Sequence, residues 1–226
     1  MNAYLRIFLV FTISCFALLG CQAEEIETAI KSKHLRQSIG GKDVTVPFEA
    51  TLSLLADSKD PETKGQLKSI GKIVEKYIDT EEFEVTTGDF GLKINIEGNI
   101  PLVYSPNGKQ VRSATSPWAL VVSNNSDGGA LSSYPHKITF AATSKFDAFS
   151  GELNNINFML SPNKHQPLKL KIKNSGKDKL RIFTGGVEVG GEHRVLYEAK
   201  VKKRVSLTMK GGVYDNAAQV VYFSFE

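Results

Sequence analysis

The sequence contains very little cysteine. Its 226 residues include two, Cys15 and Cys21, and both lie near the N-terminus. The part of the chain after Cys21 therefore cannot form an internal disulfide, so its fold has to be held together by a hydrophobic core. A chain of this length buries about 70% of its extended surface on folding, which is sufficient for one sizeable domain.

Recognisable catalytic and metal-binding motifs are also missing. The four histidines, His34, His136, His165 and His193, are scattered and show no metal-ligand spacing. The sequence has no Gly-x-Ser-x-Gly, no His-Glu-x-x-His and no glycine-rich phosphate loop that leads into a helix. We therefore expect no enzymatic activity, no cofactor and no metal site.

An apolar run near the N-terminus is too short to span a bilayer. Residues 7–19 are all apolar or small and follow the single cation Arg6, whereas a transmembrane helix needs about 20 apolar residues. A short apolar run behind a positive charge is typical of a secretory signal peptide. The chain becomes polar soon after the run, without a stop-transfer pattern. We therefore predict that residues 1–20 are a signal peptide.

The apolar run closes with Leu18-Leu19-Gly20-Cys21, which resembles the lipobox of bacterial lipoproteins. The resemblance implies cleavage before Cys21, diacylglycerol on its thiol and an acyl chain such as palmitate on its new amine. Several chains are needed because one chain anchors a protein only marginally. Gln22, where an aspartate would favour the inner membrane, implies the outer membrane with the protein facing the periplasm. The alternative is an ordinary secretory signal in which Cys21 is incidental.

Alternation of apolar and polar residues predicts a mainly β fold. The clearest strand covers 44–54, where Pro47 indicates a sheet edge or a bulge. Asp60-Pro61, followed by apolar residues three and four apart, predicts a capped amphipathic helix over 61–78. Alternation or apolar runs, separated by turn signals, predict further strands at 83–85, 92–96, 100–104, 118–122, 138–142, 156–160, 168–172, 180–183, 195–209 and 220–225.

These elements predict a single α+β domain over 43–226. We expect an antiparallel sheet or sandwich of roughly ten strands with the helix 61–78 packed on it. Residues 21–42 would then provide the lipidated cysteine and either a tether or a short first element.

Charge is distributed unevenly along the chain. Residues 24–97 contain 15 acids against 10 bases, whereas residues 164–210 contain 13 bases against 4 acids. Within the basic part, cations alternate with other residues at Lys169, Lys171, Lys173, Lys200, Lys202 and Arg204. If these strands share a sheet, they form a positive surface for anionic lipid, lipopolysaccharide or an envelope protein. The alternative is that the lysines protect sheet edges and keep the domain soluble.

The leading functional prediction is a non-enzymatic binding or adaptor module at the outer membrane. Nucleic acid is not expected as a partner, because the predicted compartment is extracytoplasmic. A lipid carrier, with an acyl chain between the helix 61–78 and the sheet, is the alternative. A hydrolase of surface polymers would need His136, His165 or His193 to meet an acid in a cleft.

A second resemblance covers about the first third of the chain that follows Cys21. The order of Glu25–Ile30, Leu35–Ile39 and Val44–Leu54 is similar to that in uncharacterised small lipoproteins of bacteriophages and prophages. The similarity implies an envelope protein made by a lysogen, which alters the host surface or excludes other phages. It implies no catalytic residue.

Overall fold

The computed structural model describes most of the chain after the predicted signal peptide. The described residues are 23–57, 59–88, 91–108, 115–158, 160, 162–164, 166–176, 179–210 and 219–226. The predicted signal peptide, Cys21 and His165 lie outside these ranges.

Strands dominate the described structure, which confirms the mainly β prediction. A 3-10 helix covers Gly129–Ser133. In chain order the other described elements are β1 (Ala23–Lys31), α2 (Ser32–Ile39), β2 (Val44–Leu54), α3 (Pro61–Tyr77), β3 (Asp79–Gly88), β4 (Gly91–Tyr104), β5 (Trp118–Asn124), β6 (His136–Ala142), α4 (Phe146–Ile156), β7 (Leu168–Lys173), β8 (Leu180–Val189), β9 (Glu192–Val201), β10 (Arg204–Met209) and β11 (Val220–Phe225).

The sheet closes on itself, so the predicted open sheet or sandwich is wrong. Nine strands follow one another in the order β10-β7-β1-β2-β4-β5-β6-β11-β8, and β8 returns to β10 where Glu188 pairs with Thr208. β3 and β9 lie outside this closed barrel, paired with β4 and β8 respectively. Not all pairs are antiparallel, because β1 with β7 and β4 with β5 run parallel. Alternation identifies the buried face of a strand but not whether the sheet's edges meet.

The strand β2 has one buried face and one outward face, which explains the alternation in its sequence. Its even-numbered residues from Val46 to Leu54 are buried, while the residues between them face outward. Pro47 does not lie on an outer edge of the sheet, since β2 pairs with both β1 and β4. The ladder with β1 nevertheless ends at Phe48, so Pro47 lies beyond it, and its carbonyl accepts a hydrogen bond from the Thr28 hydroxyl.

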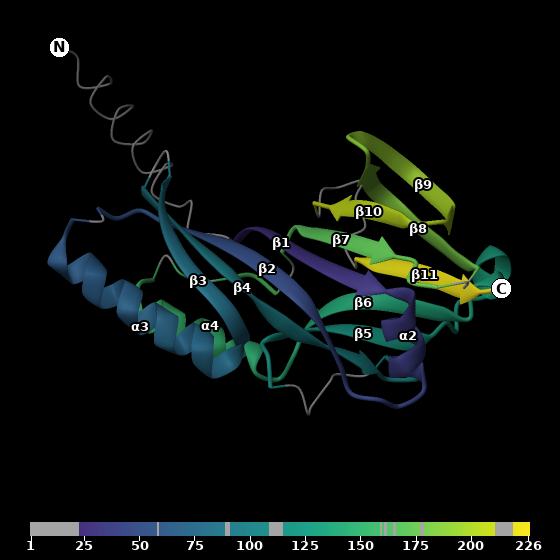
Figure 1. Cartoon of the computed structure of the whole chain (residues 1–226), viewed down its shortest axis with the longest axis horizontal. Coiled ribbons are helices and arrows are strands. Elements are labelled where there is room, and N and C mark those ends of the chain that lie inside the picture. Colours follow the sequence, from purple (N-terminus) through teal and green to yellow (C-terminus); the bar gives the residue numbers. More distant parts are fainter. Residues whose placement is uncertain are drawn as a thin grey trace, which may run out of the picture.

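The predicted helix is present as α3, and the described residues form two further α-helices, α2 and α4. The Asp60 carboxylate accepts hydrogen bonds from the backbone N–H groups of Glu62 and Thr63, as expected for an N-cap. α3 and α4 lie side by side on one flank next to β3, whereas α2 lies at the far end of the barrel (Figure 1). The predicted strand 156–160 is wrong for the described residues, because α4 extends to Ile156, 157–158 are not strand, and Leu160 forms only an isolated bridge. In the described part of the chain, no helix is both long and apolar enough to cross a bilayer.

Aromatic side chains fill the barrel where α4 packs against it. Trp118 stacks between Phe48 and Phe140, with ring centroids 5.7 and 6.5 Å away. Phe146 and Phe149 of α4 meet its ring edge-on at 5.6 and 5.5 Å. All five are buried. The interior at this point is therefore a packed core.

Candidate functional site

The three lysines of β7 point away from the barrel interior. Leu168, Leu170 and Ile172 of this strand are buried in the core, and the lysines between them lie on the outer face. The predicted alternation is therefore confirmed for Lys169, Lys171 and Lys173.

The neighbours of β7 arrange these lysines in three rows across the wall. β7 lies between β1, to which it is parallel, and β10, to which it is antiparallel. Strand pairing places opposed side chains about 4.5 to 5.5 Å apart on the same face. From one end to the other, the rows are Glu27–Lys169–Thr208, Ala29–Lys171–Ser206 and Lys31–Lys173–Arg204.

Charge is compensated at one end of this grid and not at the other. The Glu27 carboxylate, which is 16% exposed, contacts Lys169 Nζ at 2.7 Å and also pairs with Lys171 Nζ. The row Lys31–Lys173–Arg204, here called the basic row, consists of cations only. Among the described residues, no carboxylate forms an ion pair with any member of the basic row.

The other predicted cations lie elsewhere. Lys200, Lys202 and Arg204 do not share a strand, because β9 ends at Val201 and the chain turns at 202–203 before β10 begins. Lys200 lies on the face of β9 that points away from β10 and the lysines of β7. Its Nζ is 3.8 Å from a Glu226 carboxylate oxygen. Lys202 is exposed in the turn. The predicted patch of six therefore divides, and Arg204 alone of this second trio joins the lysines of β7.

A groove of about 550 Å³ lies between β9 and the outer wall formed by β7 and β10. Its cationic lining comes from Lys171, Lys173 and Arg204, and Tyr197 of β9 faces them across the groove. The remaining lining residues are Val189, Gly190, Val205 and Ser206. This basic groove combines positive charge, a hydroxyl group and apolar surface.

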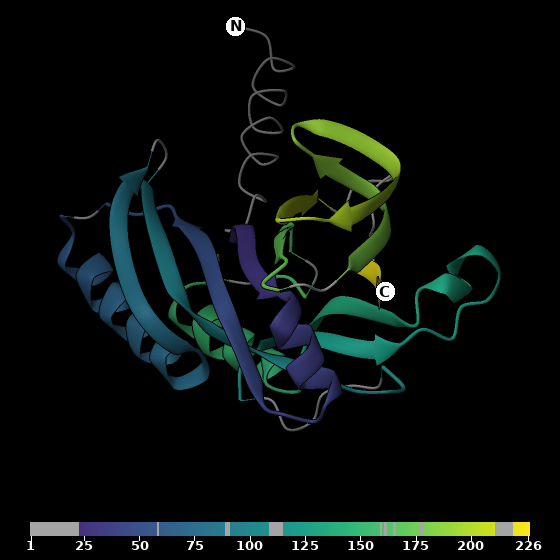
Figure 2. The same ribbon diagram turned by 45° about the vertical axis from the view of Figure 1, so that its right-hand side comes forward.

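The groove exists because β9, the second strand of the β8–β9 hairpin, lies outside the barrel. The turn of this hairpin uses Gly190 and Gly191, whose φ angles of 62° and 85° favour glycine. β9 pairs with β8 alone among the described strands, so it stands off from β10 although it is joined to it by a short turn (Figure 2). The groove is therefore a consequence of the barrel closing through β8 rather than β9.

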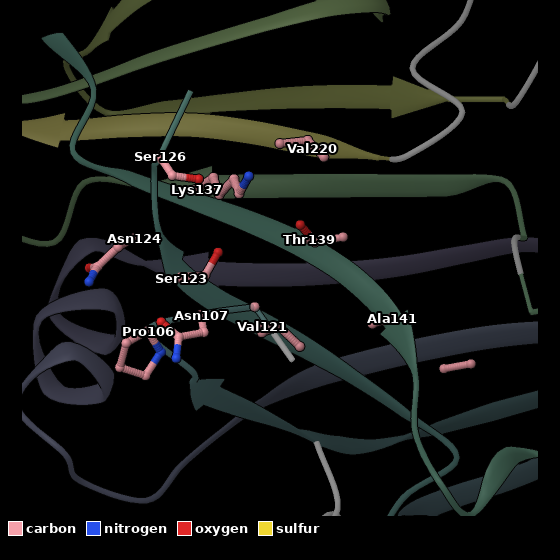
Figure 3. A pocket seen from close by; sticks show the side chains of 12 residues that line it. Pro106, Asn107, Val121, Ser123, Asn124, Ser126, Lys137, Thr139, Ala141 and Val220 are labelled. Carbon is pink, nitrogen blue, oxygen red and sulfur yellow. The ribbon is translucent and has the colours of Figure 1, made fainter. Parts of the chain in front are cut away.

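A second pocket, of about 530 Å³, lies on another part of the wall (Figure 3). Val121 of β5 and Thr139 and Ala141 of β6 point into it. Lys137 is its one cation among the described residues, and the Lys137 ammonium already pairs with Asp127 at 3.4 Å. A hydrogen bond from the Tyr222 hydroxyl, with Lys137 nearby, lowers the pKa of Asp127. This pocket is therefore largely neutral and less suited to an anion.

The predicted lipid site between the helix and the sheet has no counterpart in these pockets. Ile70 and Val74 of α3 are fully buried in the core. Neither the basic groove, the pocket of Figure 3 nor a third pocket near 41–45 and 101–104 is lined by a residue of α3.

The described histidines, which a hydrolase site would have to bring together, lie on three different elements. His34, His136 and His193 lie on α2, β6 and β9, and burial lowers the pKa of both His34 and His136. In the described ranges, no group of three or more His, Cys, Asp or Glu side chains is arranged to hold a metal ion. Asp147 and Glu152 belong to α4, where Glu152 binds Lys76 and Tyr77 of α3.

Sequence reasoning missed Tyr197 and Ser206, which line the basic groove, and Lys31, which belongs to the basic row beside it. Tyr197 and Ser206 fall within the segment 195–209, which alternation alone presents as one strand. Lys31 lies 142 residues before Lys173, and only the parallel pairing of β1 with β7 brings them together. Comparison of the chain with protein-family models, with curated proteins and with solved structures gives no match.

Proposed function

We propose that this chain is a lipoprotein anchored through Cys21 to the outer membrane, facing the periplasm, where it acts as a non-enzymatic binding or adaptor module. The basic groove captures an anionic group of an envelope partner. The observation that carries this proposal is the basic row, in which Lys173 lies in register with both Lys31 and Arg204.

Phosphate is the anion that best fits the groove. The guanidinium of Arg204 can hold two phosphate oxygens at once, and lysine ammonium groups add compact point charges. Each cation near an anionic surface contributes about 1 kcal/mol. Tyr197 and Val205 add apolar contact beside the cations. A phosphorylated headgroup of lipid or lipopolysaccharide has this combination of charge and apolar substituents.

The position of the anchor decides which end of β1 lies near the membrane. Only Gln22 separates Cys21 from β1, which begins at Ala23 and lies within the barrel wall. Two consecutive peptide units span at most about 7 Å. A lipidated Cys21 would therefore hold the start of β1 close to the headgroups of its own bilayer. Lys31 of the basic row is the last residue of this nine-residue strand, about 26 Å further along it. The groove is therefore placed for an anionic group that extends from the membrane.

The groove can be tested by the phosphorylated lipid that it retains. We would express the full chain in cells labelled with radioactive phosphate, purify it in mild detergent and measure the label that copurifies. Lys173→Thr with Arg204→Thr should remove most of the label. The control is Lys68→Thr with Lys72→Thr, which deletes two exposed cations from α3. Equal retention by both double variants would contradict the proposal.

The anchor is tested separately. Labelled palmitate should be incorporated into the wild-type chain and not into the variant Cys21→Ser. A wild-type chain that incorporates no palmitate would indicate an ordinary secretory signal. On the resemblance to phage-carried lipoproteins we further propose that this function serves a lysogen, through surface modification or superinfection exclusion. Expression from a plasmid in a non-lysogen should then reduce adsorption or infection by related phages.

A further inference from the structure

The strand β9 has a free edge with exposed apolar side chains. Among the described strands it pairs with β8 alone, and it lies at the outer margin of the molecule in both views (Figures 1 and 2). Val195 and Leu196, near its middle, are 72% and 69% exposed. An unpaired edge of this kind is a template for another strand, and proteins usually protect it.

The backbone of β9 shows which residues face that edge. The Val195 carbonyl oxygen lies only 3.0 Å from where a Cβ on Gly185 of β8 would be, so it points towards β8. In antiparallel pairing, a residue directs its N–H and C=O to the same side, and successive residues alternate. Arg194, Leu196 and Glu198 therefore direct their backbone groups to the free edge.

The side chains at these alternate positions form a self-complementary order of charge. Along one face of β9 they are Glu192, Arg194, Leu196, Glu198 and Lys200. Read in reverse, the order places a base opposite every acid. We propose that a second copy of this chain pairs with β9 in antiparallel fashion, with the two-fold axis at Leu196. Arg194 then faces the partner's Glu198, and Glu192 faces the partner's Lys200.

Neighbouring registers are disfavoured by the same charges. An axis at Val195 would place Glu192 opposite the partner's Glu198. An axis at Tyr197 would place Arg194 opposite the partner's Lys200. Like charges that face each other across a strand pair are destabilising, so the charges of β9 select the axis at Leu196.

The charged side chains of β9 have partners within the chain, but each keeps polar atoms for a second one. Arg194 pairs with Glu192 Oε2 through Nη2 alone, and Lys200 Nζ lies 3.8 Å from a Glu226 oxygen. Glu198 accepts hydrogen bonds from Tyr134 and Arg181, and both contacts use Oε1. Its second oxygen, Oε2, is the one that the partner's Arg194 would approach. Pairing about a two-fold axis also uses the free edge of both copies, so that the assembly closes at two chains. The inference does not depend on the proposed function.

A cysteine at the axis tests the pairing directly. Opposed residues of an antiparallel pair have Cα atoms about 4.5 to 5.5 Å apart, within the range that a disulfide bridges. We expect Leu196→Cys in the full-length gene product, oxidised in intact cells, to form a species of twice the mass of its own reduced monomer. Leu55→Cys, at another exposed apolar position, is the control for random collision. Equal crosslinking of both variants, or none of Leu196→Cys, would overturn the proposal.

Charge swaps distinguish this register from general stickiness. In the Leu196→Cys background, Glu192→Lys or Lys200→Glu alone should lower the crosslinked yield roughly fivefold, because each change disturbs two symmetric pairs. The double variant should restore the yield. A second swap compares Arg194→Glu alone with Arg194→Glu combined with Glu198→Arg. Because Glu198 also pairs with Arg181 within the chain, this double variant could fail to fold, and the first swap then decides. Single variants without effect, or doubles without rescue, would overturn the register.

Discussion

Lys173 of β7 and Arg204 of β10 face each other in register on the outer wall of the barrel. Lys31 of β1 adjoins Lys173 on its other side, so three cations cross three neighbouring strands. Opposed like charges in a sheet are unfavourable by about 0.2 to 1 kcal/mol each. The wall therefore contains a local destabilisation that a bound anion would relieve.

Relief of this repulsion should be measurable without any ligand. We predict that Lys173→Thr raises the free energy of unfolding by about 0.5 kcal/mol, although the same change should weaken anion capture. Lys169→Thr, on the same strand and face, should instead lower the free energy of unfolding, because it removes the ion pair between Lys169 and Glu27. Urea denaturation of the two variants compares them. Equal destabilisation by both would show that the basic row is not under strain.

Glu27 should be the carboxylate on which this wall depends most. It neutralises Lys169 and Lys171 and is mostly buried between them. We expect Glu27→Gln to lower the free energy of unfolding by about 1 to 2 kcal/mol, since two charge-assisted contacts are lost. Glu25 lies two residues earlier on β1 and is exposed, so Glu25→Gln should change stability by less than about 0.5 kcal/mol. A similar effect of both substitutions in urea titrations would exclude this role.

Two glycines should respond in opposite ways to replacement by alanine. A Cβ on Gly98 of β4 would lie 2.3 Å from the Asp79 carbonyl oxygen, where the pairing with β3 shifts register. Gly98→Ala should therefore lower the free energy of unfolding by more than about 2 kcal/mol. Gly151 lies exposed on α4 with no atom within 4 Å of such a Cβ. Gly151→Ala should raise stability by about 0.5 to 1 kcal/mol in thermal unfolding.

Local features of the fold could be read from the sequence because nearby residues determine them. The alternation in β2 follows from one buried face, and Asp60 with Pro61 defines the start of α3. α4 was missed because Ser150-Gly151 resembles a turn. Its helical spacing of Phe146, Phe149 and Leu153 is favoured by burial against Trp118, a contact that the sequence does not reveal.

The sequence predicted only part of the candidate site, because the rest depends on contacts between distant parts of the chain. Lys169, Lys171 and Lys173 share a face through strand geometry alone. Their unequal environments depend on β1, which meets β7 across about 140 residues of chain. The division of 195–209 into β9 and β10 depends on barrel closure. Long-range pairing therefore decides which cations are compensated and which line the basic groove.

The contact between α3 and α4 should weaken in acid. Hydrogen bonds from the Lys76 ammonium and then from the Tyr77 hydroxyl, each 2.7 Å long, lower the pKa of Glu152 below its ordinary value of 4.5. The unfolded chain therefore binds the proton more readily than the folded chain. The stability contributed by Glu152 is fully present above pH 4.5 and is lost as the pH falls through its lower folded pKa.

Glu152→Gln tests this titration because it removes the ionisable group. We expect urea midpoints of the wild type to fall more steeply than those of the variant between about pH 5 and pH 3. Asp147→Asn, which alters an exposed carboxylate on the same helix, should retain the steep dependence. If Glu152→Gln and the wild type lose stability in parallel over this range, other carboxylates, such as Glu198 with its lowered pKa, dominate the acid response. The contact of Glu152 with Lys76 and Tyr77 would then contribute little to the docking of the two helices.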